Sequence, residues 1–580
     1  MLTLGTPTAR AWDVSSTHLA LTEAAVVRSG LHRVLMDESG LTQGLFSPLR
    51  VDPQWLAADE RRLLERTQDV VHADSGAAPL GGPGSCPTGR APAETRRFCV
   101  DGDAWELTAV GWLRFGTFAE LTPSARLSHH FLDRADARAA TWDDPDLGAG
   151  QLRRRQTAHN GASFASRFTR LPENRDAGSA WSWLRHPPAD DPLSPARLTH
   201  HLEQARLAAS PAERAHHLAL ALVCTGALLH VVQNTAVPAH ARGDALAFFS
   251  ALSSARHDRG LPLAEFVRQA YGRRDLPLPA PANPTVQTRP LATTLGGHVL
   301  SDDAATWQSP SDVARTQLLS ESTLPLAQRL DPTASAGEVA AGLLDQLELS
   351  PSVREAAAMT PWPAPRGYVR DGNGRPLFAF AQSGDRYEFF LDDRVYRDQA
   401  VRLIPQVVEV SRSLVDLLYP AWPTPGGNDS VAISDTWQEA TLHTYVQDRD
   451  GVRREVGRHP LGPGQQPLPP PPPLGDGERS VVVLTADRVE TPRVVVQLPL
   501  TASPNDTSAT TEPKPPAAST ATGPSEAAVT RPAAPPPDGA RNDPAAPRPD
   551  SGSSSPAAGK MAEDGGESAA QPKPPGETAE

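Results

Sequence analysis

The chain has 580 residues, a formal net charge of −13 and 60 prolines. Its acidic balance argues against non-specific binding to duplex nucleic acid, for which lysine and arginine must replace condensed counterions. The only lysines are Lys514, Lys560 and Lys573, so neither a Schiff-base lysine nor a phosphate-loop lysine exists before residue 501. The sequence contains no run of 18 apolar residues, so no transmembrane helix is expected.

The N-terminus carries a hint of export. Ala9-Arg10-Ala11 has the form of a signal-peptidase site directly before Trp12, although residues 1–11 are too short for a complete signal peptide. We therefore interpret this stretch as a residual or truncated signal segment and expect a secreted or periplasmic protein. In such a compartment Cys86 and Cys99 could form a disulfide across a Gly/Pro-rich loop.

Helical periodicity dominates the chain as far as residue 420. Ser and Thr before Pro, as at Ser210-Pro211, mark helix starts. Short alternating segments with Gly-containing turns over Arg366–Phe390 predict a hairpin or three strands. The expected helices span residues 17–36, 55–71, 105–118, 179–184, 194–207, 211–232, 245–254, 263–271, 313–330, 336–349 and 392–419.

These patterns predict a mostly α fold, a multi-helix bundle over residues 12–420. Beyond a Pro/Gly run, β-like segments predict a small β module over residues 430–500. Residues 501–580 are rich in Pro, Ala and Ser and contain almost no large apolar residues. Such a composition buries too little surface to offset the entropy of ordering, so a disordered C-terminal tail is expected.

A short stretch near the middle of the chain carries the strongest chemical signal. His230 follows an almost wholly apolar run, and Asn234 lies four residues later on the same helical face. Pro238 ends the helix before His240 arrives. Two buried histidines are often satisfied core residues, but this spacing also offers several ligands to one metal ion.

Other nitrogen and oxygen donors stand beside apolar helices along the chain. A donor set without cysteine, spread over several helices, is typical of a zinc cluster inside a helical bundle. His200, His201, His216 and His217 lie beside arginines on charged helical faces, and we expect no site there. In chain order the candidates are Trp12, His18, Glu120, His130, His230, Asn234, His240, His257 or Asp258, and Glu265.

The order and local spelling of these residues resemble the zinc-dependent phospholipase C and trinuclear-zinc single-strand nuclease family, of which this would be a divergent bacterial member. The resemblance covers roughly residues 12–420 and implies up to three zinc ions in an all-helical domain. It implies that the α-amine and carbonyl of a mature N-terminal Trp12 bind zinc, followed by His18. The Glu120 segment, the Ser128-His129-His130-Phe131 motif, and the His230, Asn234 and His240 spacing match the next ligands, and His257 and Glu265 complete the set, with Asp258 as a substitute.

Two departures from the family pattern bear on activity. Glu120 replaces the usual aspartate arrangement, and Asn234 stands where a carboxylate normally bridges two zinc ions. A neutral amide adds no charge to hold two cations together, so two or fewer ions are expected if Asn234 does not bridge. For Glu265 the alternative is a solvated helix charge paired with Arg268.

The resemblance implies a zinc-dependent phosphoric diester hydrolase, similar to phospholipase C, that uses a metal-activated water with Glu120 as general base. A phospholipid or other phosphodiester is the expected substrate, with contact to a membrane surface. The acidic balance disfavours nucleic acid as the substrate. A single-strand nuclease is kept as an alternative function. A second alternative is a catalytically impaired or non-catalytic relative that acts as a secreted binding protein. No protein partner is inferable.

Overall fold

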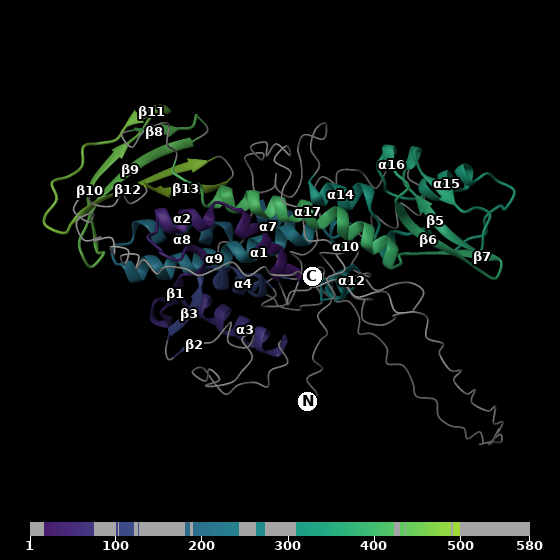
Figure 1. Ribbon diagram of the computed structural model, residues 1–580, viewed down its shortest axis with the longest axis horizontal. Helices are drawn as coiled ribbons and strands as arrows, with labels where there is room; N and C mark the ends of the chain where they lie inside the picture. Colours follow the sequence, from purple (N-terminus) through teal and green to yellow (C-terminus); the bar gives the residue numbers. More distant parts are fainter. Residues whose placement is uncertain are drawn as a thin grey trace, which may run out of the picture. The chain divides into compact units, whose positions relative to one another are not determined.

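A computed structural model describes residues 17–74, 100–101, 104–120, 126, 180–185, 190–242, 263–272, 309–422, 430–435, 437–488 and 491–498 (Figure 1). All of them belong to the first of two units, Met1–Ser508 and Ala509–Glu580. Of the described residues 49% are helical and 23% lie in strands, which form four small sheets. The prediction of a mostly α fold was therefore wrong. Helices and sheets share the described part of the chain.

Helix α9 (Pro211–Thr235) makes the most extensive helix–helix contacts in the described part of the chain. Its start is stabilised by a capping box, in which the Ser210 hydroxyl accepts from the Glu213 amide and the Glu213 carboxylate accepts from the Ser210 amide. Every residue from Leu218 to Thr235 is buried. The helix is long and apolar enough to cross a membrane, with a hydropathy of 1.7, but 89% of that apolar window is buried inside the protein. Burial of this kind is that of a core helix.

Helix α4 (Ala109–Ala119) crosses α9 at two glycines. A Cβ on Gly116 would lie 2.1 Å from the Val223 carbonyl oxygen, and one on Gly226 would lie 2.0 Å from the Leu113 carbonyl oxygen. Both obstacles are backbone atoms, which cannot rotate away. The close approach of the two helices therefore requires glycine at both positions.

The remaining helices surround this pair or lie further along the chain. The long helix α17 (Asp393–Leu418) is capped by Asp392, whose carboxylate accepts from the amides of Arg394 and Val395. The expected helix over 17–36 is divided at Ser29 and Gly30, and the one over 245–254 lies outside the described residues. The other α-helices are α1 (Leu19–Arg28), α2 (Leu31–Asp37), α3 (Ala58–Asp74), α7 (Ala180–Arg185), α8 (Pro195–Leu207), α10 (Pro238–Ala241), α12 (Leu263–Gly272), α14 (Pro310–Gln317), α15 (Ala336–Leu344) and α16 (Pro351–Glu355).

Two antiparallel sheets interrupt the helical part. In the first, β1 (Pro48–Val51) pairs with β3 (Ala104–Thr108), which pairs with β2 (Val100–Asp101). The second has the order β4-β5-β6-β7, in which the three strands predicted over Arg366–Phe390 are confirmed and one more is added. Its strands are β4 (Ala358–Thr360), β5 (Arg366–Arg370), β6 (Pro376–Ser383) and β7 (Arg386–Phe390).

The strands within residues 430–498 form two further sheets. One has the order β10-β9-β12-β13 and the other pairs β11 with β8, all antiparallel. Their apolar core includes Val431, Leu442, Leu484 and Val496. The strands are β8 (Ser430–Ile433), β9 (Trp437–Gln447), β10 (Arg453–Pro460), β11 (Gly464–Pro467), β12 (Arg479–Arg488) and β13 (Thr491–Gln497).

A buried carboxylate, Glu38, connects β13 to the helices. Its side chain accepts hydrogen bonds from the amides of Trp422 and Gln497, at 3.1 and 3.2 Å, and lies 3.7 Å from the Arg206 guanidinium. Burial is the main influence on this group and outweighs Arg206, raising the pKa of Glu38 to about 7. The carboxylate therefore takes up a proton near neutral pH.

We expect this proton to make stability depend on pH. Because the fold raises the pKa of Glu38 from 4.5 to about 7, its contribution is fully present below pH 4.5 and is lost as the pH rises through about 7. From about pH 5.5 to about pH 8 the free energy of unfolding should fall by about 2 kcal/mol on account of this group. Glu38→Gln retains an acceptor oxygen and should remove that slope in urea unfolding at both pH values. An unchanged slope in the variant would contradict the assignment.

Candidate metal centre

Three predicted ligands meet at the end of α9. His18 directly precedes α1, and its Nε2 lies 3.0 Å from Asn234 Oδ1. The His18 ring also stacks on that of His230, with centroids 3.9 Å apart and planes inclined by 13°. All three side chains are fully buried. A pair of residues separated by 216 positions, His18 and Asn234, is thus brought into direct contact.

Gln233 holds His18 from the other side. Its Oε1 lies 2.7 Å from His18 Nδ1, while its Nε2 donates to Thr22 Oγ1 at 3.2 Å and to Ser411 Oγ at 3.4 Å. Because the amide nitrogen faces these hydroxyls, the oxygen is directed at the imidazole. Gln233 therefore acts as the partner that fixes the His18 ring, a role that the sequence analysis did not assign.

The contacts of the His18 ring bear on whether these residues could hold zinc. A neutral imidazole carries only one N–H, yet both ring nitrogens of His18 face amide oxygens. The His18 to Asn234 pair therefore needs a protonated ring, a turned Asn234 amide, or a cation between the two atoms. Two ligands on one tetrahedral zinc, with bonds of about 2.0 Å, are separated by about 3.3 Å, close to the distance seen here. The Nε2 to Oδ1 separation fits two ligands of one zinc ion, whereas His18, His230 and His240, all within the described residues, do not bring three donor atoms within 4.8 Å of one another.

His240 and Glu265 differ in their surroundings. His240 is buried on α10, which packs against α9 and α14. Glu265 lies on α12 with its side chain 37% exposed, and its Oε2 accepts from Arg268 Nε at 2.7 Å. This is the surface pair that the sequence offered as the alternative to a metal ligand. Trp12, His130, His257 and Asp258 lie outside the described residues.

Glu120 is held in a buried ion-pair network. Its Oε2 accepts from Arg126 Nε at 2.9 Å and from Nη2 at 2.7 Å, and Arg126 Nη1 donates to Asp191 Oδ1 at 2.7 Å. Trp183 Nε1 donates to the second Asp191 oxygen at 2.6 Å. Burial opposes the charge on Arg126, but Glu120 and Asp191 outweigh it and raise the pKa of the guanidinium. The sequence analysis predicted that Glu120 is a general base. In the structure its carboxylate instead forms a buried ion pair with Arg126.

A second group of imidazoles lies where the sequence analysis expected no site. His200 and His201 of α8 and His217 of α9 each place one nitrogen within 4.8 Å of the others. These three histidines could hold a metal ion. The available signal was topological, because the short connection Ala208–Ser210 makes α8 and α9 an antiparallel pair, and His201 and His217 stand about two turns from it on either side.

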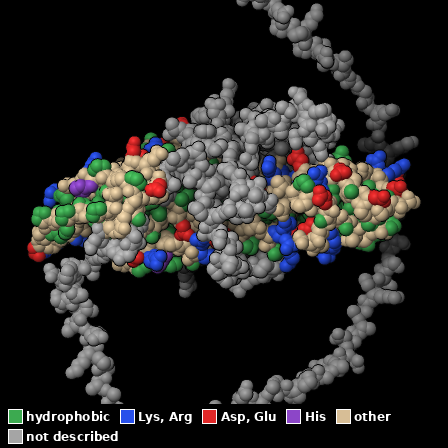
Figure 2. Space-filling model, turned by 90° about the horizontal axis from the view of Figure 1, so that it is seen from above, with side chains coloured by type: hydrophobic (Ala, Val, Ile, Leu, Met, Phe, Trp, Pro, Cys, Tyr) green, Lys and Arg blue, Asp and Glu red, His purple; other side chains and the backbone are tan. Residues whose placement is uncertain are grey.

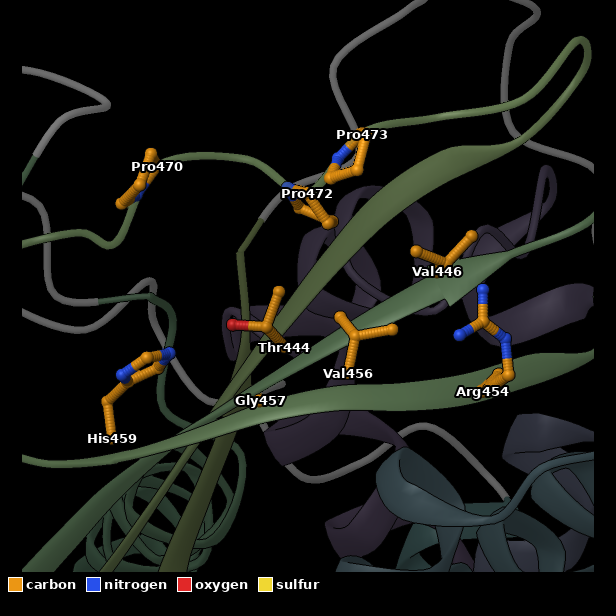
Figure 3. A pocket seen from close by; sticks show the side chains of 9 residues that line it. All are labelled: Thr444, Val446, Arg454, Val456, Gly457, His459, Pro470, Pro472 and Pro473. Carbon is orange, nitrogen blue, oxygen red and sulfur yellow. The ribbon is translucent and has the colours of Figure 1, made fainter.

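A pocket of about 320 Å³ lies between β9, β10 and the proline tract that includes Pro470, Pro472 and Pro473 (Figure 3). Thr444 and Val456 line it from the strands, His459 closes one end and Pro472 contributes from the tract. No carboxylate lines this pocket. It therefore lacks the paired donors of a zinc centre, and we do not place the metal chemistry there.

Comparison with known proteins gave no relative. No protein-family model, no curated protein and no solved structure matches the chain.

Proposed function

We propose that the chain is a zinc-dependent phosphodiester hydrolase similar to phospholipase C, with its metal centre where His18 meets the end of α9. The observation that carries the proposal is the buried contact of His18 with Asn234 and His230. The sequence analysis predicted these three residues as ligands from their order and spacing along the chain. Their meeting across 216 positions supports the proposal independently of that order.

His18, His230 and Asn234 would hold zinc in this centre, and the resemblance adds His240 as a further ligand. A bound zinc ion supplies an activated water and stabilises charge on a phosphodiester. Gln233 would keep the proton of His18 on Nδ1 and present Nε2 to the centre. The burial of the cluster strengthens each electrostatic contact within it.

The proposal includes export and a phospholipid or other phosphodiester substrate, with a membrane surface as its setting. Figure 2 supports the preference over duplex nucleic acid, because arginines and acidic side chains are interspersed among the described residues of the face shown, without a continuous basic surface. A single-strand nuclease remains the alternative substrate class. The acidic net charge again favours the smaller phosphodiester.

A second candidate function is a non-catalytic, secreted binding protein, and one observation favours it. Glu120 and Glu265, the two described carboxylates of the predicted set, both pair with arginine, and Asn234 is neutral. Among the described candidate ligands, each carboxylate is therefore already paired with an arginine. In that case the centre would bind metal weakly and hydrolyse nothing.

Asn234→Asp tests the centre directly. Without metal, the new buried carboxylate should lower the free energy of unfolding by about 3 kcal/mol, because burial penalises its charge. Zinc should restore that stability and bind more tightly than to the wild type, because the added charge attracts the cation. Zinc content by plasma mass spectrometry, urea unfolding with and without zinc, and hydrolysis of a chromogenic phosphodiester are the measurements.

Asn373→Asp is the matched control, because it adds the same charge in an exposed turn between β5 and β6. It should change neither zinc affinity nor stability by more than about 0.5 kcal/mol. If Asn234→Asp behaves like the control, Asn234 is not at a metal centre. Zinc binding without hydrolysis of any phosphodiester would favour the binding protein.

A further inference from the structure

The paired helices α8 and α9 bring a compact group of imidazoles together away from the His18 cluster. His201 Nδ1 lies 3.1 Å from His217 Nδ1, and the His200 ring centroid is 5.4 Å from that of His201 and 5.8 Å from that of His217. His201 is buried, His217 is half-buried and His200 is exposed. The group therefore opens to solvent on the His200 side.

A buried carboxylate from a third helix fixes His201. Glu60 of α3 places Oε1 at 3.2 Å from His201 Nε2, and its Oε2 accepts from the Ala57 amide at 3.0 Å. With Nε2–H donated to Glu60, the lone pair of His201 Nδ1 faces His217. A carboxylate behind an imidazole in this way is the usual support of a metal-ligating histidine.

Burial, followed by the charges of the neighbouring histidines, lowers the pKa of His217 to about 3, and burial also lowers that of His200. Burial alone would raise the pKa of Glu60, but its hydrogen bond to His201 and the charges nearby lower it to about 2.

The charges around the group also admit a cation. Arg197 is the nearby positive side chain, and it lies 3.4 Å from Asp59 and 3.9 Å from Glu60. Two carboxylates therefore face one guanidinium. A competing explanation without metal is a hydrogen bond from His217 Nδ1–H to His201 Nδ1, which the same distance allows.

We propose that His200, His201 and His217 bind a divalent transition-metal ion of the zinc class, with Glu60 as the positioning residue of His201. Three imidazole ligands with an open fourth position suit such an ion, and the 3.1 Å separation approximates the spacing of about 3.3 Å between two ligands of one tetrahedral ion. His217 and His230 are thirteen residues apart on α9, which corresponds to about 20 Å. This site is therefore distinct from the proposed hydrolase centre.

Cobalt(II) is the probe, because it takes zinc-like geometry and absorbs visible light when tetrahedral. The full chain should bind a cobalt ion at this site that remains in His230→Asn and is lost in His217→Asn, with an affinity reduced more than about 100-fold. Glu60→Gln should weaken binding by about 10- to 100-fold, the usual effect of removing such a support. His459→Asn, an exposed histidine on β10, is the control and should bind as the wild type does.

His200→Asn guards against a trivial loss of folding, because its side chain is exposed and α8 should form without it. Equal cobalt spectra and affinities in wild type, His200→Asn and His217→Asn would overturn the proposal. So would an unchanged affinity in Glu60→Gln. Loss of cobalt binding in His230→Asn alone would instead assign the ion to the His18 cluster and leave these three histidines as a hydrogen-bonded group.

Discussion

Replacing Gly226 by alanine is expected to lower the free energy of unfolding by about 3 kcal/mol, the upper end of what over-packing usually costs. The new methyl group would lie 2.0 Å from the Leu113 carbonyl oxygen, so α4 and α9 must move apart. That movement loosens contacts along the whole crossing, because interiors are close-packed. Urea unfolding of the purified chain measures the effect.

Gly337→Ala provides the control for the change in glycine itself. Gly337 is in helix α15, and a Cβ there would meet nothing within 4 Å. Alanine should therefore stabilise the chain by about 0.5–1 kcal/mol, through the lower entropy of its unfolded state. If Gly226→Ala and Gly337→Ala have the same effect, the two helices do not cross as closely as described.

Arg126→Met is expected to have an effect of similar or greater size. It removes the guanidinium from between Glu120 and Asp191 and leaves two buried carboxylates without their cation. Breaking a buried ion pair by removing one partner typically costs about 3–5 kcal/mol. The loss should be smaller at low pH, where the carboxylates take up protons, and urea unfolding at about pH 5 and about pH 8 would show this.

Arg329→Met is the matched control at the surface. Arg329 pairs with Asp385, but their side chains are 76% and 60% exposed. Exposed pairs of this kind contribute about 0–1 kcal/mol, and salt screens them. Equal losses in the two variants would mean that Glu120 and Asp191 are reached by water and do not depend on Arg126.

Local signals in the sequence predicted α9 and part of the candidate centre. Ser210-Pro211 marked the start of the helix, and the structure places it at the same residue. The four-residue step from His230 to Asn234 likewise placed both side chains on one face, where His18 meets them. Such features depend on neighbours in sequence, so a single chain reveals them.

The parts that the sequence analysis missed depend on distant partners. Strand β1 pairs with β3 more than fifty residues later, and four-residue strands leave too short an alternation to recognise. The mostly α prediction failed chiefly because the expected strands over residues 366–390 and 430–498 make up a larger share of the described chain than it allowed. Similarly, nothing near Glu120 shows that Arg126 will also reach Asp191, 65 positions away. The sequence analysis assigned His201 to a charged helical face because arginines lie beside it. In the structure His201 is buried, and its Nε2 lies 3.2 Å from Glu60 Oε1 of α3.

The burial of α9 has a consequence for the chain before it is folded. The hairpin partner α8 lies directly before it in sequence and can cover one side at once, whereas α4 and α17 come from segments about 100 and 180 residues away. Until those distant helices dock, an apolar surface of a length that also suits a bilayer stays uncovered. Self-association during refolding should therefore rise steeply with protein concentration, and dilution or a chaperone that holds apolar segments should raise the yield.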